Sequence, residues 1–333
     1  MQTIGPVKIT GPVVDAEVMV PLATFETPLW PSTNRGARVA LRSGGIRAVI
    51  VDERMTRSVL VEAPGVEEAQ RVVSALQNQR DKIRNITEAT SKFAEFVDIH
   101  FQIVANLIFI RLEMRTGDAS GHNMVTKAAE SLQDWLLAEY ADLKYISISG
   151  NYCTDKKVSA VNGILGRGKN VIAQVIVPAK ICHRYLKTTP ERIVELHIKK
   201  NLVGSIVAGG VRTANAHFAN MLLAFYLATG QDAANIVEGS QGIVHAQVRD
   251  DDLYFSVTLP NIIVGTIGSG KELPFVRDNL GMMGCLDKRK SGENSRRLAV
   301  IAAAVVLCGE LSLLGALTNP GELMQAHEKL ERR

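Results

Sequence analysis

The chain has 333 residues, of which 46% are hydrophobic and 22% charged, and its formal net charge is +4. This composition is that of a globular protein long enough for two domains, or for one domain with an insertion. Basic residues are scattered rather than gathered into one stretch, which argues against a nucleic-acid-binding protein.

The segment 58–149 alternates strands with helices. Hydrophobic periodicity predicts strands at 57–63, 96–104, 107–115 and 144–150, and helices at 66–85 and 122–142. The order β-α-β-β-α-β is typical of a ferredoxin-like unit. We therefore predict an α+β fold, in which a small ferredoxin-like domain (58–149) is inserted into a large helix-rich α/β domain (1–57 and 150–333).

The large domain is predicted to contain several helices. Helical patterns cover 189–200, 214–229 and 293–317, and Gly230 is expected to end the second of these helices. A charged tail helix at 322–333 follows a break at Pro320 and Gly321.

The compartment can be inferred from three features. The four cysteines have no C-x-x-C spacing, which indicates neither a zinc site nor a disulfide framework and fits a reducing, cytoplasmic setting. The N-terminal sequence MQTIGP lacks the regions of a secretory signal. An apolar run at 298–308 is interrupted by Gly309 and Glu310, well short of the roughly 20 residues that span a bilayer. We expect a buried helix there, no membrane span and no bound metal.

Two glycine-containing turns are candidate ligand sites. The turn at 115–123 joins a strand to a helix, where close backbone approach and free N–H groups suit a pyrophosphate. The alternative is a plain connection in which Asp118 or Asn123 caps the helix. The stretch 265–272 nearly matches a P-loop, but Glu272 stands where a metal-binding Ser or Thr is required. A nucleotide triphosphatase is therefore rejected, and a glycine turn against another ligand stays open.

Ionisable groups mark two further segments. The stretch 151–157 sets two adjacent lysines after an aspartate at the end of a strand. A fixed ammonium there would stabilise an oxyanion formed from a carbonyl, and the alternative is a solvated surface loop. Glu26 lies among apolar residues and is a candidate general acid, unless it belongs to an exposed turn. His217 and His327, taken singly, are more often structural than catalytic.

Together these segments resemble the class I hydroxymethylglutaryl-CoA (HMG-CoA) reductases. The resemblance runs from Pro6 to His327 and includes the stretches SGNYCTDKK (149–157), GRGK (166–169), 215–237, 252–270 and 292–317. It implies reduction of HMG-CoA to mevalonate and CoA by two NADPH. It also implies a homodimer or tetramer whose active site lies between subunits.

The resemblance further implies residue roles. Lys156 would stabilise the oxyanion, Glu26 would be the general acid, Asp232 would tune both, and His327 would protonate the CoA thiolate. HMG contacts would come from Arg57, Ser149, Asp155, Lys157, Lys200, His217 and Asn220. NADPH, in preference to NADH, would be bound by Ser91, Lys92, Phe93, Asp118, Gly121, Asn123, Gly265, Gly268 and Gly270.

Some positions depart from the family pattern. The N-terminal region is shorter, Thr27 and Pro28 follow Glu26, and Ser120 and His122 stand in the cofactor motif, while Lys92 replaces a usual arginine. Two alternatives therefore stay open: a reductase of a different acyl-CoA or aldehyde, and a non-catalytic CoA-binding paralogue.

Overall fold

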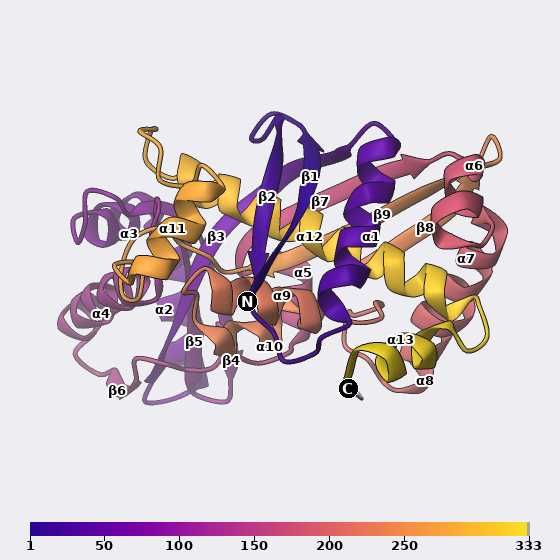
Figure 1. The fold of residues 1–333 in the computed structure, drawn as a ribbon. Helices are drawn as coiled ribbons and strands as arrows, with labels where there is room; N and C mark the ends of the chain where they lie inside the picture. Colours follow the sequence, from indigo (N-terminus) through magenta and orange to yellow (C-terminus); the bar gives the residue numbers. More distant parts are fainter. Residues whose placement is uncertain (332–333) are drawn as a thin grey trace.

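A large sheet forms the centre of the computed structural model, which describes residues 1–331 (Figure 1). Its strands pair in the order β2-β1-β3-β7-β9-β8, and every pair is antiparallel except β1 with β3. The bounds are β1 (Gln2–Thr10), β2 (Ala16–Leu22), β3 (Ile46–Glu62), β7 (Gly168–Val177), β8 (Ile243–Arg249) and β9 (Asp252–Ile262). The fold is α+β, as predicted.

A small sheet shares strand β3 with the large one. The first half of β3, to Arg54, pairs with β7, and its second half, from Met55, pairs with β5. The small sheet has the antiparallel order β6-β3-β5-β4, with β4 (Glu95–Val104), β5 (Leu107–Arg115) and β6 (Lys144–Ser147). The predicted strands at 96–104 and 107–115 are confirmed, whereas the strand predicted at 57–63 is only the end of a 17-residue strand.

Three helices cover the small sheet: α2 (Val66–Gln77), α3 (Arg80–Glu88) and α4 (His122–Glu139), at the left of Figure 1. The single helix predicted at 66–85 was wrong. The backbone leaves the helical region at Gln79 (φ −109°, ψ 27°), although no glycine or proline marks the break. A separate hydrophobic core, which includes Val72, Ile83 and Leu132, fills the space between these helices and the sheet.

Helix α12 (Glu293–Leu317) runs through the main core and packs against α1 (Leu29–Arg42), β7 and α9 (Phe218–Ala228). A Cβ atom at Gly36 of α1 would lie 1.9 Å from the carbonyl oxygen of Cys308, so the two helices touch backbone to backbone. Within residues 1–331, α12 is the one helix long and apolar enough to cross a membrane, but 94% of its apolar window is buried inside the protein. This agrees with the buried helix predicted at 293–317.

The remaining elements connect these layers. Gly230 (φ +63°) follows the end of α9 as predicted, and the helix predicted at 189–200 continues as a π-helical turn to Gly204. The last two residues of the predicted tail helix lie outside the described residues. The bounds are α5 (Ala160–Leu165), α6 (Ala179–Ile181), η1 (Cys182–Leu186), α7 (Pro190–Leu196), η2 (His197–Gly204), α8 (Ser205–Val207), η3 (Ala233–Asn235), α10 (Ile236–Gly239), α11 (Pro274–Met282) and α13 (Glu322–Glu331).

Candidate active site

A cavity of about 850 Å³, here termed the lysine cleft, lies between the two glycine turns and the segment that carries Lys156. The ammonium of Lys156 lies 2.7 Å from Asp232 Oδ2. This hydrogen bond raises the pKa of Lys156 above its ordinary value. Burial raises the pKa of Asp232, but the hydrogen bonds from Lys156 and from the Ala234 N–H outweigh it and lower that pKa overall. The pair is therefore a fixed ammonium–carboxylate pair at neutral pH.

The two glycine turns lie side by side at one end of this cleft. Ala119 and Ile267 form a parallel bridge, and the Thr266 N–H donates to the carbonyl of Asp118 (2.8 Å). A Cβ atom at Gly265 would lie 2.4 Å from the Ser120 nitrogen, so the approach requires glycine. The Asp118 carboxylate accepts from the N–H groups of Gly292 and Ser295 at the start of α12. Asp118 thus connects the glycine turn at 115–123 to the core helix α12 through these hydrogen bonds.

The N-terminus of α4 opens into the same cleft. Gly121 adopts a left-handed conformation (φ +98°) before the first turn of α4, where His122, Asn123 and Met124 line the cavity. Free N–H groups of a helix start attract phosphate oxygens. Phe93 lies close to the glycine turn that precedes α4, because a Cβ atom at Gly117 would be 4.0 Å from the Phe93 Cβ.

Burial lowers the pKa of two cleft residues that sequence reasoning did not assign. The imidazole of His122 is half-buried, and its desolvation together with the nearby charge of Arg167 lowers its pKa to about 4, so it is neutral at physiological pH. The ammonium of Lys271 donates to the Gly230 carbonyl, and burial lowers its pKa. The sequence did show that His122 deviates from the cofactor motif of the family. Lys271 was passed over, because the stretch 265–272 that contains it was rejected as a P-loop.

A second cavity of about 260 Å³, here termed the glutamate pocket, contains Glu26, His217 and His327. The Asn220 amide donates to Glu26 Oε2 (2.8 Å), so these two predicted site residues are in contact. His217 Nδ1 lies 2.7 Å from Glu310 Oε1, and the carboxylate also accepts the N–H groups of Ala216 and His217. Glu310 is fully buried in α12, where the sequence pattern showed only an interruption.

The structure divides the predicted site residues into groups. Lys156 and Asp232 line the lysine cleft together with Arg57 and Asp155, whose side chains are 3.8 Å apart. Glu26, His217 and His327 line the glutamate pocket instead. Four predicted substrate contacts line neither of these two cavities among the described residues. Ser149, Lys157 and Lys200 are exposed, and Asn220 is half-buried and contacts Glu26.

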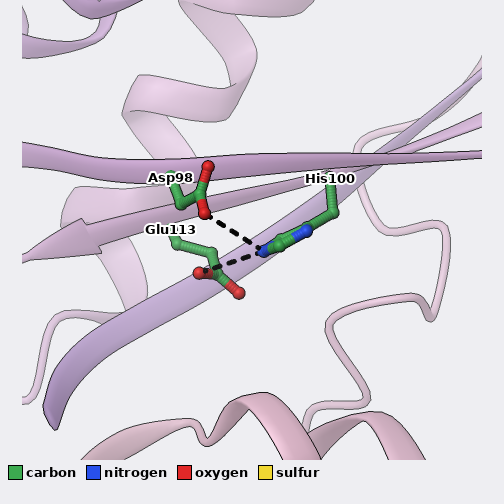
Figure 2. A group of neighbouring side chains, drawn as sticks. All are labelled: Asp98, His100 and Glu113. Atoms are coloured by element: carbon green, nitrogen blue, oxygen red, sulfur yellow. Dashed lines mark ion pairs between the residues drawn. The ribbon is translucent and has the colours of Figure 1, made fainter.

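Figure 2 shows a group that sequence reasoning did not single out, on strands β4 and β5 of the small sheet. The side chains of Asp98, His100 and Glu113 place possible metal-ligand atoms within 4.8 Å of one another. The carboxylates are already paired, Asp98 with Arg80 (2.5 Å) and Glu113 with Arg54 and Arg111. Arg54 also pairs with Asp52, so three guanidinium groups compensate three carboxylates, and the arrangement is that of an ion-pair network rather than a cation site.

Comparisons with known proteins agree with the sequence resemblance. The model of the hydroxymethylglutaryl-coenzyme A reductase family matches residues 2–332. The 3-hydroxy-3-methylglutaryl-coenzyme A reductase of Aeropyrum pernix is 42% identical, over 98% of this chain and 78% of its own length. The enzyme of the same name from Methanocaldococcus jannaschii is 40% identical, over 98% and 81%.

The fold has a solved counterpart. The class II 3-hydroxy-3-methylglutaryl-CoA reductase from Streptococcus pneumoniae, solved bound to NADPH, superposes with a TM-score of 0.76. The alignment covers 96% of this chain and 84% of that chain, at 18% identity, so it shows that the fold is shared. The family match over nearly every residue and the identity of 40–42% to these relatives lead to one conclusion: this chain belongs to the hydroxymethylglutaryl-coenzyme A reductase family.

Proposed function

We propose that this chain reduces HMG-CoA to mevalonate and CoA, consuming two NADPH and two protons, with Lys156 as the oxyanion partner. The observation that carries the proposal is the Lys156–Asp232 pair on the wall of a cleft large enough for a cofactor and an acyl group. Family membership supports the reaction, and the geometry supports the assignment of residues.

The proposed role of Lys156 follows from charge. Hydride addition to a carbonyl carbon leaves a negative charge on its oxygen, and a preorganised cation lowers the free energy of that state. The raised pKa of Lys156 keeps its amine charged, and Asp232 fixes its position. The same ammonium serves both reductions, first of the thioester and then of the aldehyde.

The residues of the two glycine turns fit a dinucleotide. Gly265 leaves room where a Cβ atom would collide with Ser120, and Gly121 opens the start of α4 to a phosphate. We assign Asp118, Gly121, Asn123, Gly265, Gly268 and Gly270 to NADPH, with Ser91, Lys92 and Phe93 at the 2′-phosphate. When bound, NADPH supplies the hydride. A lysine at position 92 provides a positive charge without the bidentate fork of an arginine.

The glutamate pocket supplies the proposed proton donors. Glu26, oriented by Asn220, acts as the general acid, and His327 protonates the departing CoA thiolate. His217 contacts the acyl group, with its Nδ1 directed at Glu310. Because Glu26 and Lys156 line different cavities of one chain, we propose a homodimer, or a tetramer built from it, in which cavities of neighbouring subunits join.

The two sheets and their separate cores support the proposed domains. Residues 58–149 form the ferredoxin-like cofactor domain, and residues 1–57 and 150–333 form the HMG-CoA-binding domain. The proposed boundary falls inside β3, three residues beyond the point where the strand changes partner from β7 to β5. We place the protein in the cytoplasm.

The test is oxidation of NADPH followed at 340 nm with HMG-CoA. Wild-type protein should oxidise NADPH only when HMG-CoA is present, and Lys156→Ala should abolish this activity. Lys199→Ala is a matched control, because Lys199 is an exposed lysine that pairs with Glu195 outside both cavities. No oxidation by the wild type, or oxidation only with another acyl-CoA or aldehyde, would refute the proposal. CoA binding without turnover would indicate a non-catalytic paralogue. An active monomer in size-exclusion chromatography would contradict the shared site.

A further inference from the structure

The backbone that carries Lys156 is held in an unfavourable conformation. Three residues of the segment 151–156 have positive φ angles without being glycine: Asn151 (60°), Thr154 (45°) and Lys156 (55°). A left-handed conformation is sterically unfavourable for an L-residue other than glycine. The segment therefore needs tertiary contacts that select this conformation over a relaxed one.

One short stretch, 232–238, holds Lys156 at both ends. Asp232 pairs with the side-chain ammonium, and Glu238 Oε1 accepts the backbone N–H of Lys156 at 3.1 Å. The Glu238 side chain has no solvent exposure, and Asn235 donates to the same oxygen at 3.0 Å. The position of the Lys156 ammonium therefore depends on the buried carboxylate of Glu238, which holds the Lys156 backbone.

Arg167 extends this contact to the neighbouring residue. Its guanidinium is 1% exposed, donates to Glu238 Oε1 (2.7 Å) and forms an ion pair with Asp155 Oδ1 (3.0 Å). Gly166 and Gly168, both with positive φ, bring the Arg167 backbone into this corner. The Arg167 guanidinium thereby links Asp155 to Glu238. It holds Asp155 directly, and it holds Lys156 through the Glu238 carboxylate that accepts the Lys156 N–H.

We propose that Glu238 and Arg167 are positioning residues for the reduction, which hold Asp155 and the strained backbone of Lys156 so that its ammonium faces the cleft. The inference rests on the function proposed above. Neither residue lines the lysine cleft, so both act through Asp155 and Lys156. Loss of the contact should lower kcat, because a displacement of about 1 Å at a reacting group costs roughly 100-fold in rate.

Steady-state kinetics of three variants test the proposal. Glu238→Ala removes the acceptor and should lower kcat about 10- to 100-fold while KM for NADPH stays unchanged. Glu238→Gln keeps an oxygen at the same place and should restore most of kcat. Arg167→Lys keeps the charge but cannot reach both Asp155 and Glu238, so it should also lower kcat.

Glu53→Gln is the matched control. Glu53 is a buried carboxylate (7% exposed) between Lys169 (3.2 Å) and Arg296 (2.7 Å), without contact to the Lys156 segment. It should lower Tm and leave kcat unchanged. The proposal is overturned if Glu238→Ala keeps the wild-type kcat, or if Glu53→Gln loses as much kcat as Glu238→Ala. If Glu238→Ala does not fold, wild-type kcat in Arg167→Lys overturns it. Inactivity of the wild type would instead refute the proposed function itself.

Discussion

The buried carboxylate of Glu310 offers a sharp test of how the glutamate pocket is held. Its two oxygens accept three hydrogen bonds, from the Ala216 N–H (3.0 Å), the His217 N–H (2.5 Å) and the His217 Nδ1 (2.7 Å). Substitution by glutamine keeps one acceptor oxygen and turns the other into a donor, which faces at least one N–H group. We therefore expect Glu310→Gln to disrupt the contact without changing the volume of the core.

The expected loss can be worked from these bonds. A hydrogen bond to a charged group contributes about 1.5–3 kcal/mol, and a buried donor left unpaired costs about 1–3 kcal/mol. Removal of the buried charge offsets part of this loss, so we expect a net destabilisation of about 2–3 kcal/mol. At about 2 °C per kcal/mol for a chain of this size, Tm should fall by about 4–6 °C.

Thermal unfolding followed by circular dichroism and HMG-CoA kinetics would measure the two consequences together. Release of the His217 ring should raise KM for HMG-CoA, whereas KM for NADPH should not change. Glu293→Gln, in the first turn of the same helix, should shift stability by no more than about 0.5 kcal/mol. A Glu310→Gln protein that melts within 1 °C of the wild type (roughly half a kcal/mol) would refute the reasoning.

Three more predictions follow from other sites. Burial lowers the pKa of His197 to about 4, from 6.5. The unfolded chain therefore binds a proton at His197 more readily than the folded chain. The contribution of neutral His197 to the free energy of unfolding is fully present above pH 6.5 and falls by up to about 3 kcal/mol toward pH 4. In urea unfolding at several pH values, the free energy of unfolding of His197→Gln should depend less steeply on pH than that of the wild type. An equally steep pH dependence would contradict this reasoning. Gly265→Ala should cost about 1–3 kcal/mol and raise KM for NADPH, since its Cβ would overlap Ser120. Unchanged melting and kinetics would argue against that close contact. Lys92→Glu should raise KM for NADPH about tenfold, equivalent to 1.4 kcal/mol, and leave KM for NADH unchanged. Equal effects on both cofactors would show that Lys92 does not contact the 2′-phosphate.

Hydrophobic periodicity predicted those helices and strands that have a regular apolar pattern and a clear stop signal in the sequence. Strand β5 alternates apolar and polar residues in sequence, although the structure also buries Arg111 and Glu113 of its polar positions, and helix α12 contains the long apolar run at 298–308. The break between α2 and α3 could not be predicted, because Asn78 and Gln79 are ordinary helix residues and the packing of α3 against α4 decides the geometry. The length of β3 was missed for a similar reason, since one strand serves two sheets.

The site was predicted in part. Lys156 and Asp232 could be named from a family resemblance, but their ion pair depends on the fold, which joins the ends of two distant segments. Spacing also gave no sign that Glu26 and Lys156 line different cavities. The parallel contact between Ala119 and Ile267 was likewise invisible, because a single bridge between two loops leaves no periodic pattern.

Buried charges were the signal that sequence reasoning used least. A carboxylate without solvent needs compensating donors, since the free-energy cost of burying it alone is several kcal/mol. Glu310 interrupts the most apolar helix of the chain, and its partner His217 lies 93 residues away in sequence. Glu238, in turn, holds the backbone of Lys156 from 82 residues away. In both cases the charge inside an apolar element is explained by a proposed site residue that it orients. A charged residue that breaks a hydrophobic pattern should therefore be treated as a pointer to a site, whose position only the tertiary structure supplies.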